Sequence, residues 1–274
     1  MRRKVDAWFV AAVVLIALGA GAGCNKLRAR DQLNKGVTAY KNAQFDVAIE
    51  DFKNARELDP TLTNAQLYLA AAYANQYIPG APSPENLRNA DSAIQVYKEI
   101  LQGDPNNLSA IDGIGSLLYN MGTTPFDESK LQQAKEYHEK HIQISPNDPE
   151  PYYWVGVIDW ALAYRANRDM RDTFNRTANP KKQVKENDPL PEKLRTEFTD
   201  KNGQTVDEGI TNLQKAISLK PDYDDAMAYL NLMYRQKADM ETTKEAREDD
   251  LKKADDLVEQ VKAIKQKKAG MQPS

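Results

Sequence analysis

The sequence is short of the residues on which metal binding and nucleophilic catalysis most often depend. It contains one cysteine, Cys24, and therefore cannot form a disulfide within the chain. Its two histidines, His138 and His141, stand three residues apart, a spacing that places both on one face of a helix. No third ligand and no base-orienting residue lies nearby in the sequence. We therefore predict that both histidines are structural and that the chain holds no metal.

Catalytic motifs are also missing. The sequence has no nucleophile elbow and no glycine-rich loop that could hold a phosphate. We therefore predict no catalytic residue, no cofactor and no small-molecule substrate, and we do not expect an enzyme. Basic and acidic residues number 37 and 40, and no basic block stands out, so nucleic acid is not an expected partner.

The longest apolar run lies near the N-terminus, from Ala7 to Leu18. It is shorter than the roughly 20 residues that a membrane-spanning helix needs. Basic residues precede this run, and small residues follow it as far as Gly23 and Cys24. This order is typical of a secretory signal, so residues 1–23 are predicted to be a signal peptide and residues 24–30 a linker.

Ala22-Gly23-Cys24 resembles the end of a bacterial lipobox, although Gly21 stands where that motif prefers leucine. The resemblance implies that Cys24 is acylated and becomes the N-terminus after cleavage, which would hold the protein on a bilayer. Asn25 follows the cysteine in place of the aspartate that favours inner-membrane retention in enterobacterial lipoproteins. The resemblance thus implies the periplasmic face of the outer membrane. The alternative is an ordinary signal peptide that happens to end beside a cysteine.

The rest of the chain carries an internal repeat. From Gly36 to Pro60, apolar and small residues recur on both sides of an interruption at residues 42–44, which predicts two helices joined by a turn. A small residue precedes a proline by twelve positions at Ala48–Pro60, Ala93–Pro105, Ala134–Pro146 and Gly209–Pro221. Four positions after each small residue stands a larger one: Phe52, Tyr97, His138 and Leu213. The preceding helices have small residues where paired helices would cross, at Gly36, Ala70, Gly115 and Gly156, with Asn231 in the last.

These hairpins resemble the tetratricopeptide repeat (TPR) family, whose second helices carry the same small and large positions and end at a proline. The resemblance implies an all-α, right-handed superhelical solenoid of about five hairpins, with repeats near residues 31–62, 63–107, 108–148, 149–223 and 224–268. Excess residues are expected as loops between paired helices at residues 77–89, 122–130 and, as a long insertion, 164–205. The charged segment at residues 242–268 is expected to form a long capping helix, followed by a tail at residues 269–274.

TPR arrays bind partners mostly in the concave groove that their first helices line, so the resemblance implies a protein or peptide partner there. The residues of this sequence that fall on that lining are Tyr40, Lys41, Tyr68, Asn75, Asp112, Tyr119, Asn120, Tyr153, Trp160, Arg235 and Gln236. Tyrosine and tryptophan offer large contact areas, and asparagine and aspartate can bind a peptide backbone. The set lacks the pattern with which some family members clamp a C-terminal carboxylate, so that mode is not predicted.

The combined expectation is a lipid-anchored binding scaffold of the bacterial cell envelope. It is similar in architecture to the TPR lipoproteins of outer-membrane barrel assembly and of type IV pilus biogenesis. The alternative is an accessory protein that binds a small molecule, a glycan or a metal through the aromatic groove and the long insertion.

Overall fold

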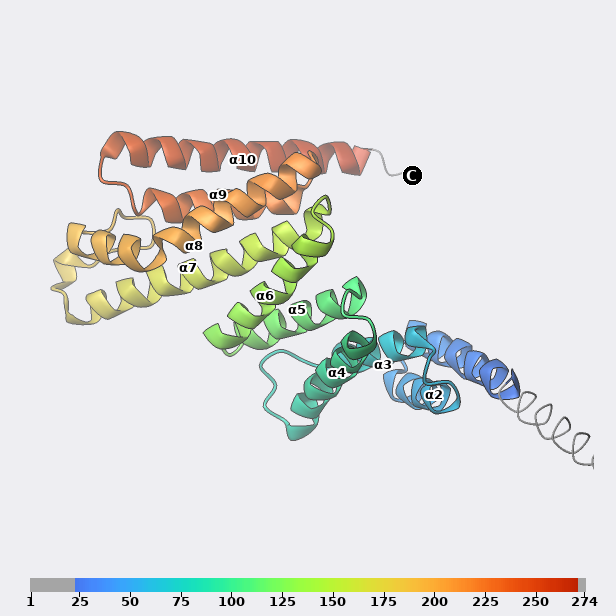
Figure 1. Cartoon of the computed structure of the whole chain (residues 1–274). Coiled ribbons are helices and arrows are strands. Elements are labelled where there is room, and N and C mark those ends of the chain that lie inside the picture. The colour runs from blue at the N-terminus through green and yellow to red at the C-terminus, as the bar shows by residue number, and fades with distance from the viewer. Residues whose placement is uncertain (1–22, 271–274) are drawn as a thin grey trace, which may run out of the picture. The chain divides into compact units, whose positions relative to one another are not determined.

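The structure is a computed structural model that describes residues 23–270. These residues form α-helices, one 3-10 turn and no strand, which confirms the all-α fold class (Figure 1). Residues 1–22, which hold almost all of the predicted signal peptide, and residues 271–274 lie outside the described part. The chain divides into two compact units between Leu117 and Leu118, here called the N-terminal unit and the C-terminal unit.

In the N-terminal unit, a helix over residues 23–41 is followed by further helices: α2 (Phe45–Leu58), α3 (Thr63–Gln76), α4 (Pro84–Gly103) and the first part of α5 (Leu108–Thr123). α2 packs on α3, and α3 packs on α4. The inward face of α2 includes Phe52, which is completely buried as the repeat pattern predicts. A β-carbon on Gly36 would lie 2.5 Å from Cε1 of Phe52, so glycine is required where their two helices cross.

The predicted linker at residues 24–30 is helical instead, and that prediction was wrong. The helix that carries Gly36 begins no later than residue 23, and Ala29 on it is completely buried. Ala29 and Gly36 are two helical turns apart, so the face that packs in the first hairpin continues through the expected linker. Cys24 is exposed on this helix.

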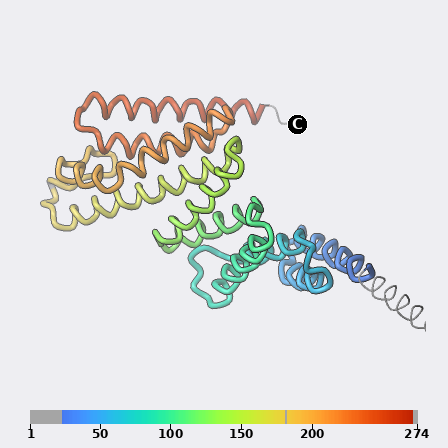
Figure 2. The backbone as a smooth tube through the Cα atoms, in the orientation of Figure 1, coloured from blue at the N-terminus to red at the C-terminus, as the bar shows by residue number. Residues whose placement is uncertain are grey.

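The C-terminal unit contains the end of α5 and then α6 (Glu128–Ile144), α7 (Pro149–Thr177), a 3-10 turn (Pro180–Lys182), α8 (Glu192–Leu219), α9 (Asp224–Ala238) and α10 (Lys244–Gly270). Each helix from α6 to α10 packs on the next one, and α9 also packs on α7 (Figure 2). A β-carbon on Gly156 of α7 would lie 2.4 Å from Cγ of Leu213, which is completely buried on α8. The predicted crossing of Gly156 over the second helix of its repeat is therefore confirmed.

The long insertion predicted at residues 164–205 is mostly helix rather than loop. α7 continues to Thr177 and α8 begins at Glu192, so only residues 178–191 lie outside them. The inward face of α7 continues through Asn167 and Arg171, which are 4% and 5% exposed. Because these buried residues are polar, the periodicity of apolar residues does not predict this part of the helix. On α8 the added turns bury Leu194 and Phe198. The other loops are also shorter than predicted, at residues 77–83 and 124–127, and α10 extends two residues into the expected tail.

Both histidines are buried on α6, at 0% exposure for His138 and 3% for His141. His138 stacks on Trp154 with ring centroids 5.7 Å apart and planes 11° from parallel. Burial lowers the pKa of His138 to about 4, so its ring is neutral at pH 7. Within residues 23–270 no group of three histidine, cysteine, aspartate or glutamate side chains is placed to hold a metal ion. Over the same range no helix has both the length and the apolar character needed to cross a membrane.

Candidate partner-binding site

Three of the predicted groove residues of the N-terminal unit, Tyr40, Tyr68 and Asn75, meet in one small patch. Nδ2 of Asn75 on α3 donates a hydrogen bond of 2.7 Å to the hydroxyl of Tyr40, which lies on the first helix. The ring of Tyr40 meets the ring of Tyr68 edge-on, with centroids 5.9 Å apart. Tyr68 is 37% exposed, so this patch offers both aromatic surface and hydrogen-bonding groups to solvent. Lys41 is exposed at the end of the first helix, and Asp112 lies half-buried on α5.

In the C-terminal unit, half-buried aromatic rings form a continuous series that we call the aromatic row. Its members, in contact order, are Tyr119, Trp154, Tyr153, Tyr229, Trp160 and Tyr164. Successive ring centroids lie 5.2 to 5.8 Å apart, within the range of favourable aromatic pairs. The row leads from the end of α5 across α7 and α9, and Asn120 is exposed beside its first member.

Half of the rings in this row could be predicted from the sequence. The sequence predicts that Tyr119, Tyr153 and Trp160 line a groove. In the structure Trp154 and Tyr229 join these three rings, and Tyr164 extends the row beyond Trp160. Tyr164 follows Tyr153 and Trp160 at spacings of eleven and four residues, which keeps all three on one side of a helix. That signal was available, but Tyr164 was assigned to the insertion. Burial raises the pKa of Tyr119 to about 12, so its hydroxyl stays protonated.

Beyond Trp160 and Tyr164 the row opens into a cavity of about 640 Å³. Its walls are the C-terminal half of α7, residues 184–187 of the loop, the end of α9 and the first turns of α10. Trp160, Arg235 and Gln236 are the predicted groove residues that line it. The volume is in the range of sites that hold a small ligand or a short stretch of peptide.

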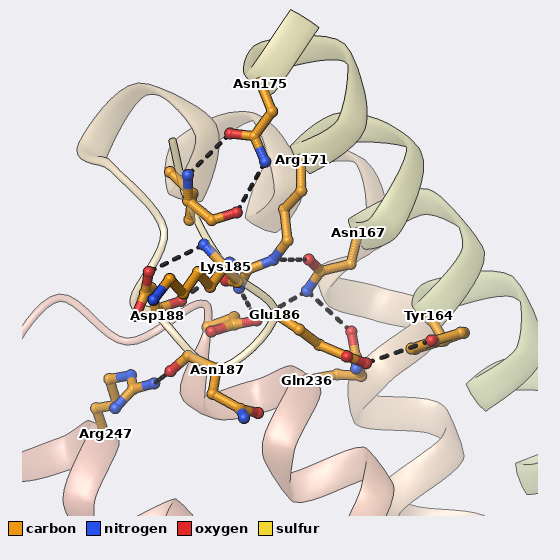
Figure 3. A network of polar contacts seen from close by, with 12 residues as sticks. Tyr164, Asn167, Arg171, Asn175, Lys185, Glu186, Asn187, Asp188, Gln236 and Arg247 are labelled. Atoms are coloured by element: carbon orange, nitrogen blue, oxygen red, sulfur yellow. Dashed lines mark hydrogen bonds and ion pairs between the residues drawn. The ribbon is translucent and has the colours of Figure 1, made fainter. Parts of the chain in front are cut away.

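One buried guanidinium holds the cavity walls together (Figure 3). Nε of Arg171 donates to Oδ1 of Asn167 at 2.7 Å, and Nη2 pairs with Oδ2 of Asp239 at 2.7 Å. Its Nη1 donates to the main-chain oxygens of Lys185 at 2.6 Å and Asp188 at 3.0 Å. A single side chain of α7 is thus bonded to the end of α9 and to the loop at residues 178–191.

Further contacts fix the same loop (Figure 3). The side chain of Asn175 both donates to the main-chain oxygen of Val184 at 2.9 Å and accepts from its N–H at 2.8 Å. Nη2 of Arg247 on α10 donates to the main-chain oxygen of Asn187 at 3.0 Å. Because α7, α9 and α10 all bind the loop or its anchor, the cavity wall is ordered before any ligand arrives.

A second buried charge lies deeper in the C-terminal unit. Asp159 on α7 is completely buried, and its Oδ1 lies 2.8 Å from Nζ of Lys135. The same ammonium lies 2.8 Å from Oε2 of Glu208 on α8. Burial raises the pKa of Asp159 to about 7, more than the contact with Lys135 lowers it. The group joins α6, α7 and α8 and belongs to the packing of the unit rather than to the cavity.

The raised pKa of Asp159 predicts a pH dependence of stability. Between its ordinary value of 3.8 and about 7, the folded chain holds a proton on this carboxyl that the unfolded chain has lost. The contribution of Asp159 to the free energy of unfolding is therefore full below this window and falls as pH rises through it. The matched variant is Asp159→Asn, which cannot titrate. In urea unfolding, the free energy of unfolding of the wild type should fall relative to that of the variant from pH 4 to pH 7. A constant difference between the two proteins across this range would contradict the assignment.

Comparison with known proteins supports the fold. No protein-family model matches the sequence, and no curated protein matches it. A double mutant of MamA RS-1 is 16% identical and superposes with a TM-score of 0.55, over 88% of this chain and 96% of its own. MamA from Desulfovibrio magneticus RS-1 is 17% identical with a TM-score of 0.54, over 88% and 96%. A further MamA structure, 16% identical, has a TM-score of 0.54 over 90% and 97%.

At these identities the likeness concerns the fold alone. Together with the repeat spacing and the confirmed crossings at Gly36 and Gly156, it establishes a TPR-like fold of helical hairpins. The insertion between α7 and α8, with its cavity, is the part of this fold that the repeat pattern does not account for.

Proposed function

We propose that this protein is a TPR-type scaffold that binds a protein partner and is attached to the bacterial cell envelope through a lipid on Cys24. The observation that carries the proposal is the aromatic row of the C-terminal unit, in which half-buried rings from α5, α7 and α9 touch in series. Tyrosine and tryptophan dominate the energetics of protein interfaces because they bury large areas while keeping a polar group for hydrogen bonding.

The scaffold function is tested by quantitative affinity capture from detergent-solubilised envelopes. Trp160→Ala removes the ring that stacks on Tyr164 at 5.2 Å and meets Tyr229 at 5.3 Å, and it should reduce partner recovery at least tenfold. A central aromatic residue in an interface is commonly worth 2 kcal/mol or more, which is about thirtyfold in affinity. Tyr137→Ala is the matched control, because Tyr137 is a half-buried aromatic residue on α6 outside the row. Equal recovery by both variants and the wild type would count against the proposed surface.

The lipid anchor is a separate prediction. Cys24 is exposed and carries the chain's only thiol, so it is accessible to modification. Cells labelled with a radioactive fatty acid should yield labelled wild-type protein in the membrane fraction, and Cys24→Ser should be unlabelled and released from membranes. Fractionation of the labelled envelope would then assign the inner or outer membrane. Equal labelling of both proteins would contradict the predicted acylation of Cys24 and would not affect the proposed scaffold function.

We further propose that the partner belongs to an envelope or outer-membrane complex during its assembly. The predicted signal peptide and lipobox, which would deliver the chain to the periplasmic side, support this role. Deletion of the gene should then lower the amount of at least one assembled envelope complex. Restoration by the wild type but not by Trp160→Ala would connect that loss to the aromatic row.

The cavity favours a second candidate function. A cavity of about 640 Å³ beside two aromatic rings suits an accessory protein that binds a small molecule or a glycan. Native mass spectrometry of the protein released gently from envelopes separates the two functions. Copurification of a discrete small molecule that Trp160→Ala loses would favour the second.

A further inference from the structure

The cavity is continuous with the aromatic row, so a partner lying along the row can reach into it. Trp160 and Tyr164 belong to both. Leu232 on α9, Leu251 on α10 and Val184 on the loop add apolar surface to the lining. The lining is therefore mixed and contains both apolar and charged side chains.

The charges that line the cavity are unequally neutralised. Its cationic side chains are Arg168, Arg171, Lys185, Arg235 and Arg247. Arg171 pairs with Asp239 at 2.7 Å, and Arg235 pairs with Asp255 at 2.7 Å. Within the described residues, Arg168, Lys185 and Arg247 have no carboxylate at ion-pair distance. The acidic side chains left on the lining are Asp172 and Glu186, so positive charge is in excess here although the whole chain has a net charge of −3.

Arg247 is the most informative of the three. Arg247 is half-buried, and the one hydrogen bond of its guanidinium within the described chain runs from Nη2 to the main-chain oxygen of Asn187. Its Nε is shielded from solvent and has no acceptor. A partly desolvated guanidinium with unused donors is unfavourable alone and is the best match for a carboxylate, which can accept two parallel hydrogen bonds. Arg168 is exposed on α7 and Lys185 is exposed on the loop, and both line the same space.

We infer that this cavity receives an acidic side chain, glutamate or aspartate, from an extended segment of the protein partner that lies along the aromatic row. Arg247 binds the carboxylate, and Arg168 and Lys185 supply the surrounding positive potential. Arg171, Asn167 and Asp239 stay bonded to one another and to the loop, so they position the wall without touching the ligand. The inference rests on the proposed scaffold function and names the chemistry of the partner at this site.

The test is fluorescence anisotropy with the full-length protein in detergent and three labelled octapeptides that alternate alanine with glutamate, glutamine or lysine. The glutamate peptide should bind at least tenfold more tightly than the other two. Arg247→Gln and Lys185→Gln should each weaken it several-fold, and Arg88→Gln, an equal charge change at an exposed position on α4, should leave its affinity within about twofold. Lys185→Gln keeps the test decisive if Arg247→Gln does not fold, because the Lys185 side chain is exposed.

Several outcomes would overturn the inference. Equal binding of the glutamate and glutamine peptides, no binding of any peptide, or equal weakening by Arg88→Gln would exclude an acidic segment in this cavity. Displacement of the glutamate peptide by citrate at the same carboxylate concentration would assign the site to a small carboxylate instead of a peptide. Partner capture that depends on Trp160 but not on Arg247 would overturn this inference alone, whereas failure to capture any partner would overturn the proposed function.

Discussion

Gly156→Ala is expected to destabilise the C-terminal unit by about 1–3 kcal/mol, although alanine is the better helix former. The added methyl group would lie 2.4 Å from Cγ and 2.8 Å from Cδ2 of Leu213, a completely buried side chain. The backbones of α7 and α8 must then separate where they cross. Trp154 and Trp160 both lie in this unit, so urea unfolding followed by tryptophan fluorescence reports the change directly.

Two further variants make the expected result specific. Gly203→Ala places its methyl group 3.2 Å from the flexible Cε end of Met240 and should change stability by less than about 1 kcal/mol. In a Leu213→Ala background the space opposite Gly156 is empty, so Gly156→Ala should lower the free energy of unfolding by clearly less than it does in the wild type. If the two substitutions are additive, the crossing is not a direct contact and the hairpin assignment is wrong.

Arg171→Met is expected to lower the free energy of unfolding by about 3–5 kcal/mol, because it removes one member of a buried ion pair and leaves the other charge buried without its counter-ion. Asp239 is 8% exposed, and after the substitution only Asn167 would still donate to its carboxylate. The main-chain oxygens of Lys185 and Asp188 would lose their donor as well. Hydrogen exchange should therefore accelerate across residues 178–191 in addition to the loss of global stability.

Arg168→Met is the control for this substitution. Arg168 lies three residues earlier on the same helix and is exposed, and its side chain makes no hydrogen bond or ion pair within the described residues. Its replacement should alter stability by no more than about 0.5 kcal/mol. Similar losses in both variants, or unchanged exchange in the loop of Arg171→Met, would show that the loop is held in another way.

The hairpins could be predicted from the sequence because their packing is local and recurs. Gly36 faces Phe52 and Gly156 faces Leu213, as the small and large positions of the repeat require, and the twelve-residue spacing to proline marks where second helices end. Such features depend on residues of one hairpin, whose side chains alternate between buried and exposed with the period of a helix. The fold class therefore followed from the repeat spacing and from the resemblance to the TPR family that this spacing carries.

The cavity could not be predicted in the same way. Its inward positions on α7 are Asn167 and Arg171, which a search for apolar stripes assigns to solvent or to a loop. Asp239, which binds both of them, lies 68 residues after Arg171 in the chain, so no nearby sequence feature predicts this ion pair. The end of α7 was missed for this reason, and so was the loop wall. A polar stripe at Asn167, Arg171 and Asn175, four residues apart, was the one signal in the sequence.

The central claim is that a protein partner lies on the aromatic row and enters the cavity, and in-cell photo-crosslinking tests it most directly. Benzoylphenylalanine placed at Tyr164, which lines both features, should form a covalent adduct with a protein on irradiation of living cells. The same group at Tyr137 on α6 should form none, and the segment crosslinked at position 164 should be rich in glutamate or aspartate. Absence of a protein adduct at position 164, or equal adducts at both positions, would contradict the account.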